Sequence, residues 1–324
     1  MNNYVFSKGF ASGADISWLP MMEATGFKFR DSCGAEKDFF TILKGYGMNA
    51  VRLRAWVSPS VNPYSGHCST EETLQMGLRA KQSGFDVMID FHYGDTWCDP
   101  GKQVKPAAWK DLPFDGLVEA LYDYTREAMG VFVSNGLVPK WVQLGNEINP
   151  GMLLPDGSIV NFGKLVRLIN AGHKAVKEVS PSTLTMVHLA EGNNTEFCKS
   201  FYDALAQNGC TYDLAGLSYY PYHAKRANAD IIDDLAATIK LIPERYDKDV
   251  MIVEVGGVDA EEDESYELLV SVIERCHAEK RCTGFFYWEP QGARVWSNYP
   301  LSAWRADGTP TRAMDAYYRI SIQA

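Results

Sequence analysis

The chain has 324 residues, of which 46% are hydrophobic and 22% are charged, a composition typical of a globular fold with a large core. Its formal net charge of -10 argues against nucleic acid or an anionic membrane as a partner, because both attract basic surfaces. The sequence holds no apolar run of membrane-spanning length, and its start lacks a basic region followed by an apolar one. We therefore expect neither a membrane span nor a signal peptide within it.

Strands and helices are predicted to alternate along the whole chain. Period-two and period-3.6 patterns of apolar residues, with Gly, Pro and polar turns between them, set the boundaries. In chain order the predicted strand and helix pairs are 8–15 with 36–46, 51–56 with 70–83, 86–93 with 114–134, 139–147 with 163–179, 184–188 with 195–208, 214–220 with 230–245, 249–254 with 264–279, and 284–288 with a short helix over 311–318. Residues 17–20 are predicted to form a turn.

Eight such units predict the fold class α/β, as a single (β/α)8 TIM barrel domain over residues 1–324, because eight is the number that closes a parallel sheet. The alternative is a doubly wound open sheet. That fold would place a glycine-rich phosphate turn after the first strand, and Gly9-Phe-Ala-Ser-Gly13 lacks the GxGxxG order.

Two of the predicted strands end in a glutamate. Residues 139–149 run as an apolar strand into Asn146 and Glu147, and residues 249–254 end at Glu254, 107 residues after Glu147. In an eight-stranded barrel these are strands four and seven, so the two carboxylates face each other across the mouth where such barrels hold their active sites. Paired carboxylates are typical catalytic residues of a glycosidase.

Polar or aromatic residues are predicted at the other strand ends as well. These residues are Asp15, Arg52, Arg54, His92, Tyr93, His188, Tyr220 and Trp288. Arg52 and Arg54 share one face of their strand, and inside a barrel both need carboxylate partners.

Two other chemistries find little support in the sequence. His92, His188 and His223 could form a zinc site, but no HExxH or HxH spacing accompanies them, and a nucleophilic serine would need a motif such as GxSxG. No cysteine pair has CxxC spacing. Cys276 and Cys282 could pair, although buried reduced cysteines are favoured. We predict no metal ion and no cofactor.

Five motifs in order resemble the arabinogalactan endo-β-1,4-galactanases of glycoside hydrolase family 53, in the retaining clan A. They are Phe91-His-Tyr-Gly-Asp-Thr-Trp-Cys-Asp-Pro100, Gly145-Asn-Glu-Ile148, Ser218-Tyr-Tyr-Pro221, Ile252-Val-Glu254 and Tyr287-Trp-Glu-Pro290. The resemblance runs from about Phe10 to Trp288. It departs from the family at Thr96 and Cys98, where serine and alanine are commoner, and the short segment after Glu254 leaves no room for the calcium loop of some bacterial members.

This resemblance implies roles for individual residues. Glu147 would be the acid/base and Glu254 the nucleophile, and Asn146 would contact the 2-hydroxyl of the reacting sugar. Arg52, Tyr220 and Trp288 would support the nucleophile and the sugar at subsite -1.

The implied substrate is β-1,4-galactan, a neutral polysaccharide that suits an acidic protein. We expect the chain to lie in an open groove of aromatic residues, namely Trp56, Tyr93, Trp97, Trp109 and Trp296. Galactose differs from glucose in its axial 4-hydroxyl, and we expect Asp15, His92 and Asp95 to reach that oxygen.

Location and assembly follow from the substrate. A pectic side chain cannot cross a membrane, so we expect the natural protein to be exported to a secreted, periplasmic or cell-surface location, with this chain as its mature part. We expect a monomer. The alternatives are a non-catalytic carbohydrate-binding barrel and another clan A enzyme, such as a mannanase, cellulase or xylanase.

Overall fold

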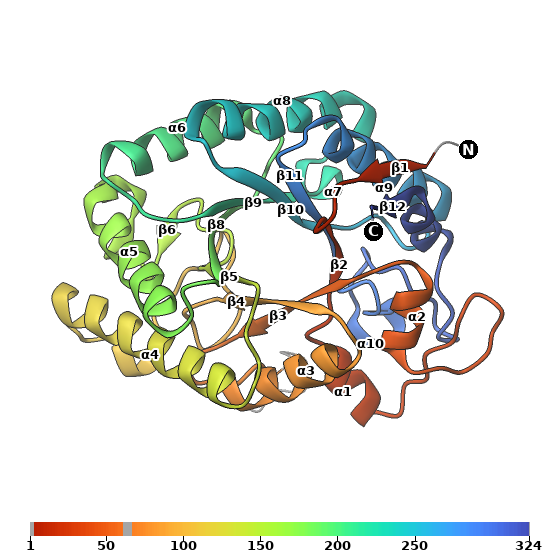
Figure 1. Cartoon of the computed structure of the whole chain (residues 1–324), viewed down its shortest axis with the longest axis horizontal. Helices are drawn as coiled ribbons and strands as arrows, with labels where there is room; N and C mark the ends of the chain where they lie inside the picture. Colours follow the sequence, from red (N-terminus) through yellow and green to blue (C-terminus); the bar gives the residue numbers. More distant parts are fainter. Residues whose placement is uncertain (1–2, 61–66, 324) are drawn as a thin grey trace.

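A closed barrel of parallel strands forms the centre of the protein. The computed structural model describes residues 3–60 and 67–323, and in this part of the chain eight strands close into a barrel ringed by helices (Figure 1). In the order in which they pair, the barrel strands are β2 (Ala11–Asp15), β3 (Ala50–Ala55), β4 (Asp86–Phe91), β5 (Trp141–Leu144), β8 (Leu184–Leu189), β9 (Leu214–Tyr219), β10 (Asp249–Val255) and β11 (Cys282–Trp288). The predicted (β/α)8 TIM barrel is confirmed.

The helices lie outside the barrel, largely where the apolar spacing predicted them. They are α1 (Leu19–Ala24), α2 (Phe39–Gly45), α3 (Thr70–Gln82), α4 (Phe114–Ser134), α5 (Phe162–Val179), α6 (Thr195–Gln207), α7 (Pro221–Ala224), α8 (Asn228–Tyr246), α9 (Glu262–Ala278) and α10 (Arg294–Ser297), with 3-10 helices over Ala107–Trp109, Ile159–Asn161 and Arg312–Arg319. None of the helices among the described residues is long and apolar enough to span a membrane.

Three details differ from the prediction. The turn expected over 17–20 leads directly into α1, where Pro20 sits in the first turn, a position that suits its fixed φ. The expected last helix is a 3-10 helix. Two short strand pairs were missed because two or three residues carry no periodic signal: β1 (Tyr4–Phe6) with β12 (Ile320–Ile322), and β6 (Gly151–Met152) with β7 (Gly157–Ser158).

The barrel interior changes from apolar to polar along the strands. A lower cluster of buried side chains contains Ala11, Ala50, Met88, Trp141, Met186, Leu214, Met251, Val253 and Phe286. Because side chains alternate along a strand, residues two positions further on also point inward. These residues include Arg52, Asp90, Gln143 and His188, all fully buried. Apolar side chains therefore fill the lower part of the barrel, and a layer of charged side chains lies above them at the C-terminal ends of the strands.

A bulge in β10 brings Glu254 into that charged layer. Met251 and Val253 both belong to the interior cluster, so simple alternation would turn Glu254 outward. The pairing of β10 with β9 shifts register between Ile252 and Glu254, and bulges of this kind redirect side chains beside active sites. Glu254 then reaches Arg52, with Oε1 2.9 Å from Nη2.

The narrow barrel interior leaves no room for a side chain at Gly13 of β2, and this can be tested. An added Cβ there would lie 2.7 Å from the backbone oxygen of Ala50 and 2.5 Å from the Phe286 ring. We expect Gly13→Ala to destabilise the fold by about 1–3 kcal/mol, seen as a lower thermal midpoint. In Gly130→Ala, within α4, the new Cβ meets no described atom within 4 Å, and we expect a gain of roughly 0.5–1 kcal/mol. A midpoint unchanged by Gly13→Ala would contradict this account.

Candidate active site

A small cavity of about 190 Å³ opens where the C-terminal ends of the barrel strands meet. It contains both predicted glutamates. Its lining consists of His92, Trp97, Cys98, Asp99, Asn146, Glu147, Tyr220, His223, Glu254, Trp288 and Tyr299. These residues come from loops and strand ends that follow β4, β5, β9, β10 and β11, so the site belongs to the face that barrels use for chemistry.

Glu147 reaches the cavity through an unusual backbone conformation. It follows β5 by three residues and has a φ of 46°, in the left-handed region that costs a residue with a Cβ about 1–2 kcal/mol. Its backbone N–H donates to His188 Nδ1 at 3.3 Å. Such strain persists only where the surrounding structure holds it, so the conformation of Glu147 is fixed by its neighbours.

The two glutamates are close enough to act on one bond. Oxygens of Glu147 and Glu254 and a ring nitrogen of His188 all lie within 4.8 Å of one another. A separation near 5 Å between carboxyl groups fits a retaining glycosidase, whereas an inverting one needs more space for a water molecule.

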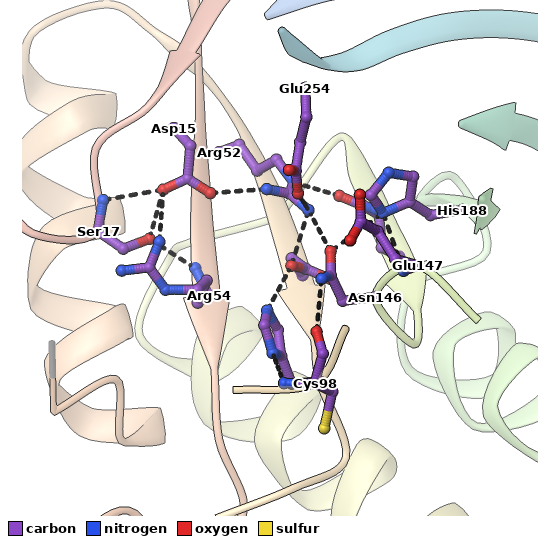
Figure 2. A network of polar contacts seen from close by, with 12 residues as sticks. Asp15, Ser17, Arg52, Arg54, Cys98, Asn146, Glu147, His188 and Glu254 are labelled. Atoms are coloured by element: carbon purple, nitrogen blue, oxygen red, sulfur yellow. Dashed lines mark hydrogen bonds and ion pairs between the residues drawn. The ribbon is translucent and has the colours of Figure 1, made fainter. Parts of the chain in front are cut away.

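Arg52 is a fully buried cation beneath the cavity, and its guanidinium contacts three carboxylates (Figure 2). Nη1 lies 2.8 Å from Asp15 Oδ2, and Nη2 lies 2.8 Å from Asp90 Oδ2 and 2.9 Å from Glu254 Oε1. Nη2 also donates to Asn146 Oδ1 at 2.8 Å. The predicted need of Arg52 for carboxylate partners is therefore met.

Charge is distributed unevenly over these carboxylates. Burial alone would raise the pKa of Asp90, but Arg52 and His92 hold it at about 2. Burial raises the pKa of Glu147 to about 7, only partly opposed by Ser218 and Arg52. Among the described residues, neither lysine nor arginine forms an ion pair with Glu147.

Glu254, unlike Glu147, has a cation beside its carboxylate. Burial raises its pKa too, but Arg52 lies against Oε1, and Tyr220 Oη donates to Oε2 at 3.1 Å. Both contacts favour the ionised form. Because two carboxylates this close cannot both ionise easily, we assign the proton near neutral pH to Glu147 and the charge to Glu254.

His188 supports Glu147 from below. Its Nδ1 lies 3.0 Å from Asn146 Oδ1, and its Nε2 lies 2.8 Å from Ser218 Oγ. Burial holds the His188 pKa well below its ordinary value, so the ring is neutral. By distance, Glu147, His188 and Glu254 could ligate a metal ion, but Arg52 already places a positive charge against Glu254.

Aromatic rings form one side of the cavity. Trp288 packs edge-on against Trp18 at 5.2 Å, Trp97 at 5.8 Å and Tyr299 at 4.9 Å between ring centroids. The Arg54 guanidinium lies 4.3 Å from the centre of the Trp97 ring, a cation–π distance.

A buried glutamate anchors this aromatic wall. Glu289, next to Trp288, forms an ion pair with Arg54 and accepts a hydrogen bond from Trp18 N at 3.1 Å. Burial raises the Glu289 pKa to about 8, against the opposing effect of Arg54. The ion pair links the strand end that carries Trp288 to β3, and the hydrogen bond links it to the residue before α1.

The structure brings together most of the residues predicted for the site. His92, Trp97, Asn146, Glu147, Tyr220, Glu254 and Trp288 line the cavity. Arg52 and Asp15 lie directly beneath it, both fully buried.

The expected aromatic groove is wrong in three places. Tyr93 is 1% exposed, and its Oη lies 2.9 Å from Thr125 Oγ1 on α4, so the ring points away from the cavity. Alternation along the strand gives the same result, because Asp90 and His92 face the interior and their neighbour Tyr93 therefore faces outward. Trp56 is fully buried behind Trp97, and Trp109 packs against Tyr124.

Trp296, also expected in the groove, is half-buried but lies outside the cavity lining. Its ring packs against Trp18 with 5.9 Å between centroids, and its Nε1 donates to Thr25 Oγ1 at 3.0 Å.

The three residues expected to recognise an axial hydroxyl are engaged in the protein itself. Asp15 is fully buried and accepts from Arg52, Arg54 and Ser17. His92 accepts the Cys98 N–H at Nδ1 and pairs with Asp90 through Nε2.

Asp95 accepts the backbone N–H groups of Ser58 and Ala107 and lies outside the cavity lining. It therefore fixes the loop instead of reaching into the cavity. Local sequence could not reveal several of these bonds, because Arg52 and Arg54 lie on another strand than Asp15, and Ser58 lies in another loop than Asp95.

Four lining residues were not predicted for the site: Cys98, Asp99, His223 and Tyr299. Asp99 and Cys98 stand in the motif Phe91–Pro100, which is dense in polar and aromatic residues, so a signal existed. Tyr299 lies eleven residues beyond β11, in a loop without a periodic pattern, and only the tertiary fold reveals it.

Comparison with known proteins gives a consistent result. Residues 11–314 match the model of glycosyl hydrolase family 53. The arabinogalactan endo-beta-1,4-galactanase A of Emericella nidulans is 34% identical over 249 residues, which cover 75% of this chain and 69% of that protein.

Solved structures agree with the match. A family 53 catalytic domain from Ignisphaera aggregans superimposes with a TM-score of 0.87 and 30% identity over 95% of both chains. A structure from a study of two fungal beta-1,4-galactanases also gives 0.87, with 26% identity over 96% of this chain and 99% of that one.

The raised pKa of Glu147 predicts a pH-dependent stability. Between its ordinary value of 4.5 and about 7, the folded protein keeps a proton that the unfolded chain has released. This contribution is complete at low pH and is lost as pH rises through the window. Glu147→Gln removes the titration, so relative to the wild type we expect it to gain on the order of 1–3 kcal/mol between about pH 4 and pH 8.

Thermal unfolding at the two pH values measures this difference. Glu127→Gln, a change at an exposed glutamate of α4, is the control and should not show it. A Glu147→Gln variant whose midpoint follows the wild type across the window would contradict the raised pKa.

Proposed function

The chain belongs to glycosyl hydrolase family 53, and from that premise we propose that it is an endo-acting enzyme that cleaves β-1,4-galactosidic bonds in galactan with retention of configuration. The observation that carries this proposal is the pair of glutamates within 4.8 Å, one protonated and the other charged. Retaining glycosidases need this arrangement, because one carboxyl group donates a proton while the other attacks carbon.

In the proposed first step, Glu254 attacks the anomeric carbon of the sugar at subsite -1. The glycosidic C–O bond breaks, its electron pair moves to the leaving oxygen, and Glu147 donates its proton there. The remaining galactan fragment departs with a new hydroxyl group, and the sugar stays on Glu254 as a glycosyl ester. Arg52 and Tyr220 hold Glu254 ionised and aimed until the attack.

In the second step a water molecule hydrolyses the ester. Glu147 gave up its proton in the first step and is now a carboxylate, so it can act as the base. It accepts a proton from water, the hydroxide oxygen bonds to the anomeric carbon, and Glu254 leaves as a carboxylate. Two displacements on the same carbon restore the β-configuration.

Asn146 is suited to contact the 2-hydroxyl of the reacting sugar. Its Oδ1 accepts from Arg52 at 2.8 Å, and its Nδ2 donates to Cys98 O at 2.7 Å. An amide nitrogen has two hydrogens, so one donor remains for the sugar. Trp288 offers its ring as a platform for the apolar face of the same sugar.

Recognition of galactose is proposed for residues whose polar atoms can still bind a sugar. The polar atoms of Asp15, His92 and Asp95 are hydrogen-bonded within the protein. Asp99 and His223 line the cavity, and each keeps a side-chain polar atom without a hydrogen bond among the described residues. Tyr299 lines the cavity too, with its hydroxyl group hydrogen-bonded to Tyr220.

The substrate also bears on location and assembly. A galactan polymer cannot cross a membrane, so we propose that the protein works outside the cytoplasm, in a secreted, periplasmic or cell-surface location. The site is built from one chain, and we propose that a monomer is active.

The two glutamates should respond differently to substitution. Glu147→Ala should lower kcat/KM on galactan by about 10²–10⁴-fold but spare dinitrophenyl β-1,4-galactobioside, whose leaving group departs without a proton. Glu254→Ala should abolish turnover of both substrates, because no nucleophile remains. Equal losses on both substrates for the two variants would show that the roles are misassigned.

Substrate choice and stereochemistry can be tested together. We expect the protein to release short galacto-oligosaccharides from β-1,4-galactan and to leave mannan, cellulose and xylan essentially uncut, because polar groups placed for one hydroxyl pattern reject another by up to about 10⁴-fold. Proton NMR of the first products should show the β-anomer. Comparable rates on mannan or cellulose, or an initial α-anomer, would refute the proposed specificity or mechanism.

A further inference from the structure

Gln103, in the loop between β4 and α4, donates two hydrogen bonds to the backbone around Glu147. Its Nε2 lies 2.8 Å from Asn146 O and 3.3 Å from Glu147 O. The side chain is 3% exposed. Both acceptors are carbonyl oxygens, so the amide orientation is determined: only the nitrogen end can make these bonds.

The two carbonyls belong to the peptides on either side of the strained residue. Glu147 has a φ of 46°, and the extended region would be lower in energy for a glutamate in isolation. A rotation of Glu147 towards that region would move Glu147 O relative to Asn146 O and break at least one of the two bonds. Gln103 therefore opposes the relaxation that would withdraw the carboxyl group from the cavity.

The oxygen end of the Gln103 amide indicates that the nitrogen end is the part with a role. No donor among the described residues reaches Gln103 Oε1, although the atom is buried. An unpaired buried acceptor costs about 1–3 kcal/mol. A residue used only to fill space would not carry that cost, so the two N–H donors are the useful part of this side chain.

Gln103 is itself held on both sides. Its backbone oxygen accepts the N–H of Leu154 at 2.8 Å, and its neighbour Val104 forms a parallel bridge with Leu154. Leu154 lies between β6 and β7, in the segment that follows Glu147. The loop before the acid and the hairpin after it are thereby joined, with Gln103 between them.

We propose that Gln103 is a positioning residue of the catalytic acid, which holds the left-handed backbone of Glu147 so that its carboxyl group meets the leaving oxygen. This inference rests on the proposed function, because it takes Glu147 as the acid. Gln103 touches neither the substrate nor the reacting atoms, and it acts only through Glu147.

The test replaces Gln103 by methionine, which has similar length and no N–H donor. A displaced acid loses proton transfer but not binding. We expect kcat/KM on galactan and on phenyl β-1,4-galactobioside to fall about tenfold or more, while kcat/KM on the dinitrophenyl galactobioside changes little. The ratio between activated and unactivated substrates is the readout, since a general loss of folded protein lowers both equally.

Thr183→Val is the matched control. Thr183 Oγ1 is buried and donates to Pro139 O at 2.7 Å, near the N-terminal end of β5, so this variant also removes a side-chain bond to a backbone carbonyl but does so far from Glu147. We expect a lower thermal midpoint and an unchanged substrate ratio.

Gln103→Glu adds a second readout that does not depend on the methionine variant folding well. An ionised glutamate presents only acceptors to the two carbonyls, whereas a protonated one regains an O–H donor. We expect its activity on galactan, relative to the wild type at the same pH, to recover as pH falls.

Glu147→Ala, measured beside these variants, separates the two possible failures. If it loses turnover selectively on unactivated substrates while Gln103→Met keeps the substrate ratio of Thr183→Val, the positioning role is refuted and the proposed function stands. If Glu147→Ala shows no selectivity, the acid is misassigned and both proposals fall. Selective losses in Glu147→Ala and Gln103→Met, with recovery of Gln103→Glu at low pH, support the positioning role.

Discussion

The charged end of the barrel depends on one buried guanidinium. Arg52 has no exposed surface, and its contacts with Asp15, Asp90 and Glu254 connect β3 to β2, β4 and β10. A buried charge is tolerated only when it is paired, and removal of one partner from such a network costs about 3–5 kcal/mol. The need to neutralise Arg52 thus fixes where the strand ends stand relative to one another.

The same cation makes two chemically identical glutamates different. Arg52 lies against Glu254, so its charge is used to keep that side chain ionised. Glu147 lies in the same buried cavity without an ion-pair partner among the described residues, and burial leaves its pKa at about 7. The proposed acid and the proposed nucleophile are therefore distinguished by the position of a cation on a third strand, which lies outside both of their motifs.

Sequence patterns revealed the barrel and the strand ends but not where every side chain points. Alternation correctly placed Arg52 and Arg54 inward, because β3 is regular. It also places Tyr93 on the outer face, where the ring is found, so the expectation of Tyr93 in the groove went against the pattern. Alternation failed for Glu254, which the bulge in β10 turns inward. This irregularity depends on the pairing of β10 with β9, which period-two spacing within one strand cannot encode. Asp15 and His92 stand at the expected strand ends. Asp15 is bonded to two arginines of β3, and His92 is bonded to Asp90 of β4 and to Cys98 in the following loop, bonds that the strand pattern does not show.

Strand β3 joins the charged and aromatic halves of the site. Arg52 and Arg54 are two residues apart and face the same interior, about 7 Å from each other along the strand. Arg52 meets carboxylates, whereas Arg54 meets Glu289 and the Trp97 ring. Because both guanidinium groups extend from one rigid strand, the distance from the aromatic wall to Glu254 is set by the spacing of a β-strand. The loops then need only to place Glu147, which explains why its backbone is held by side chains such as Gln103.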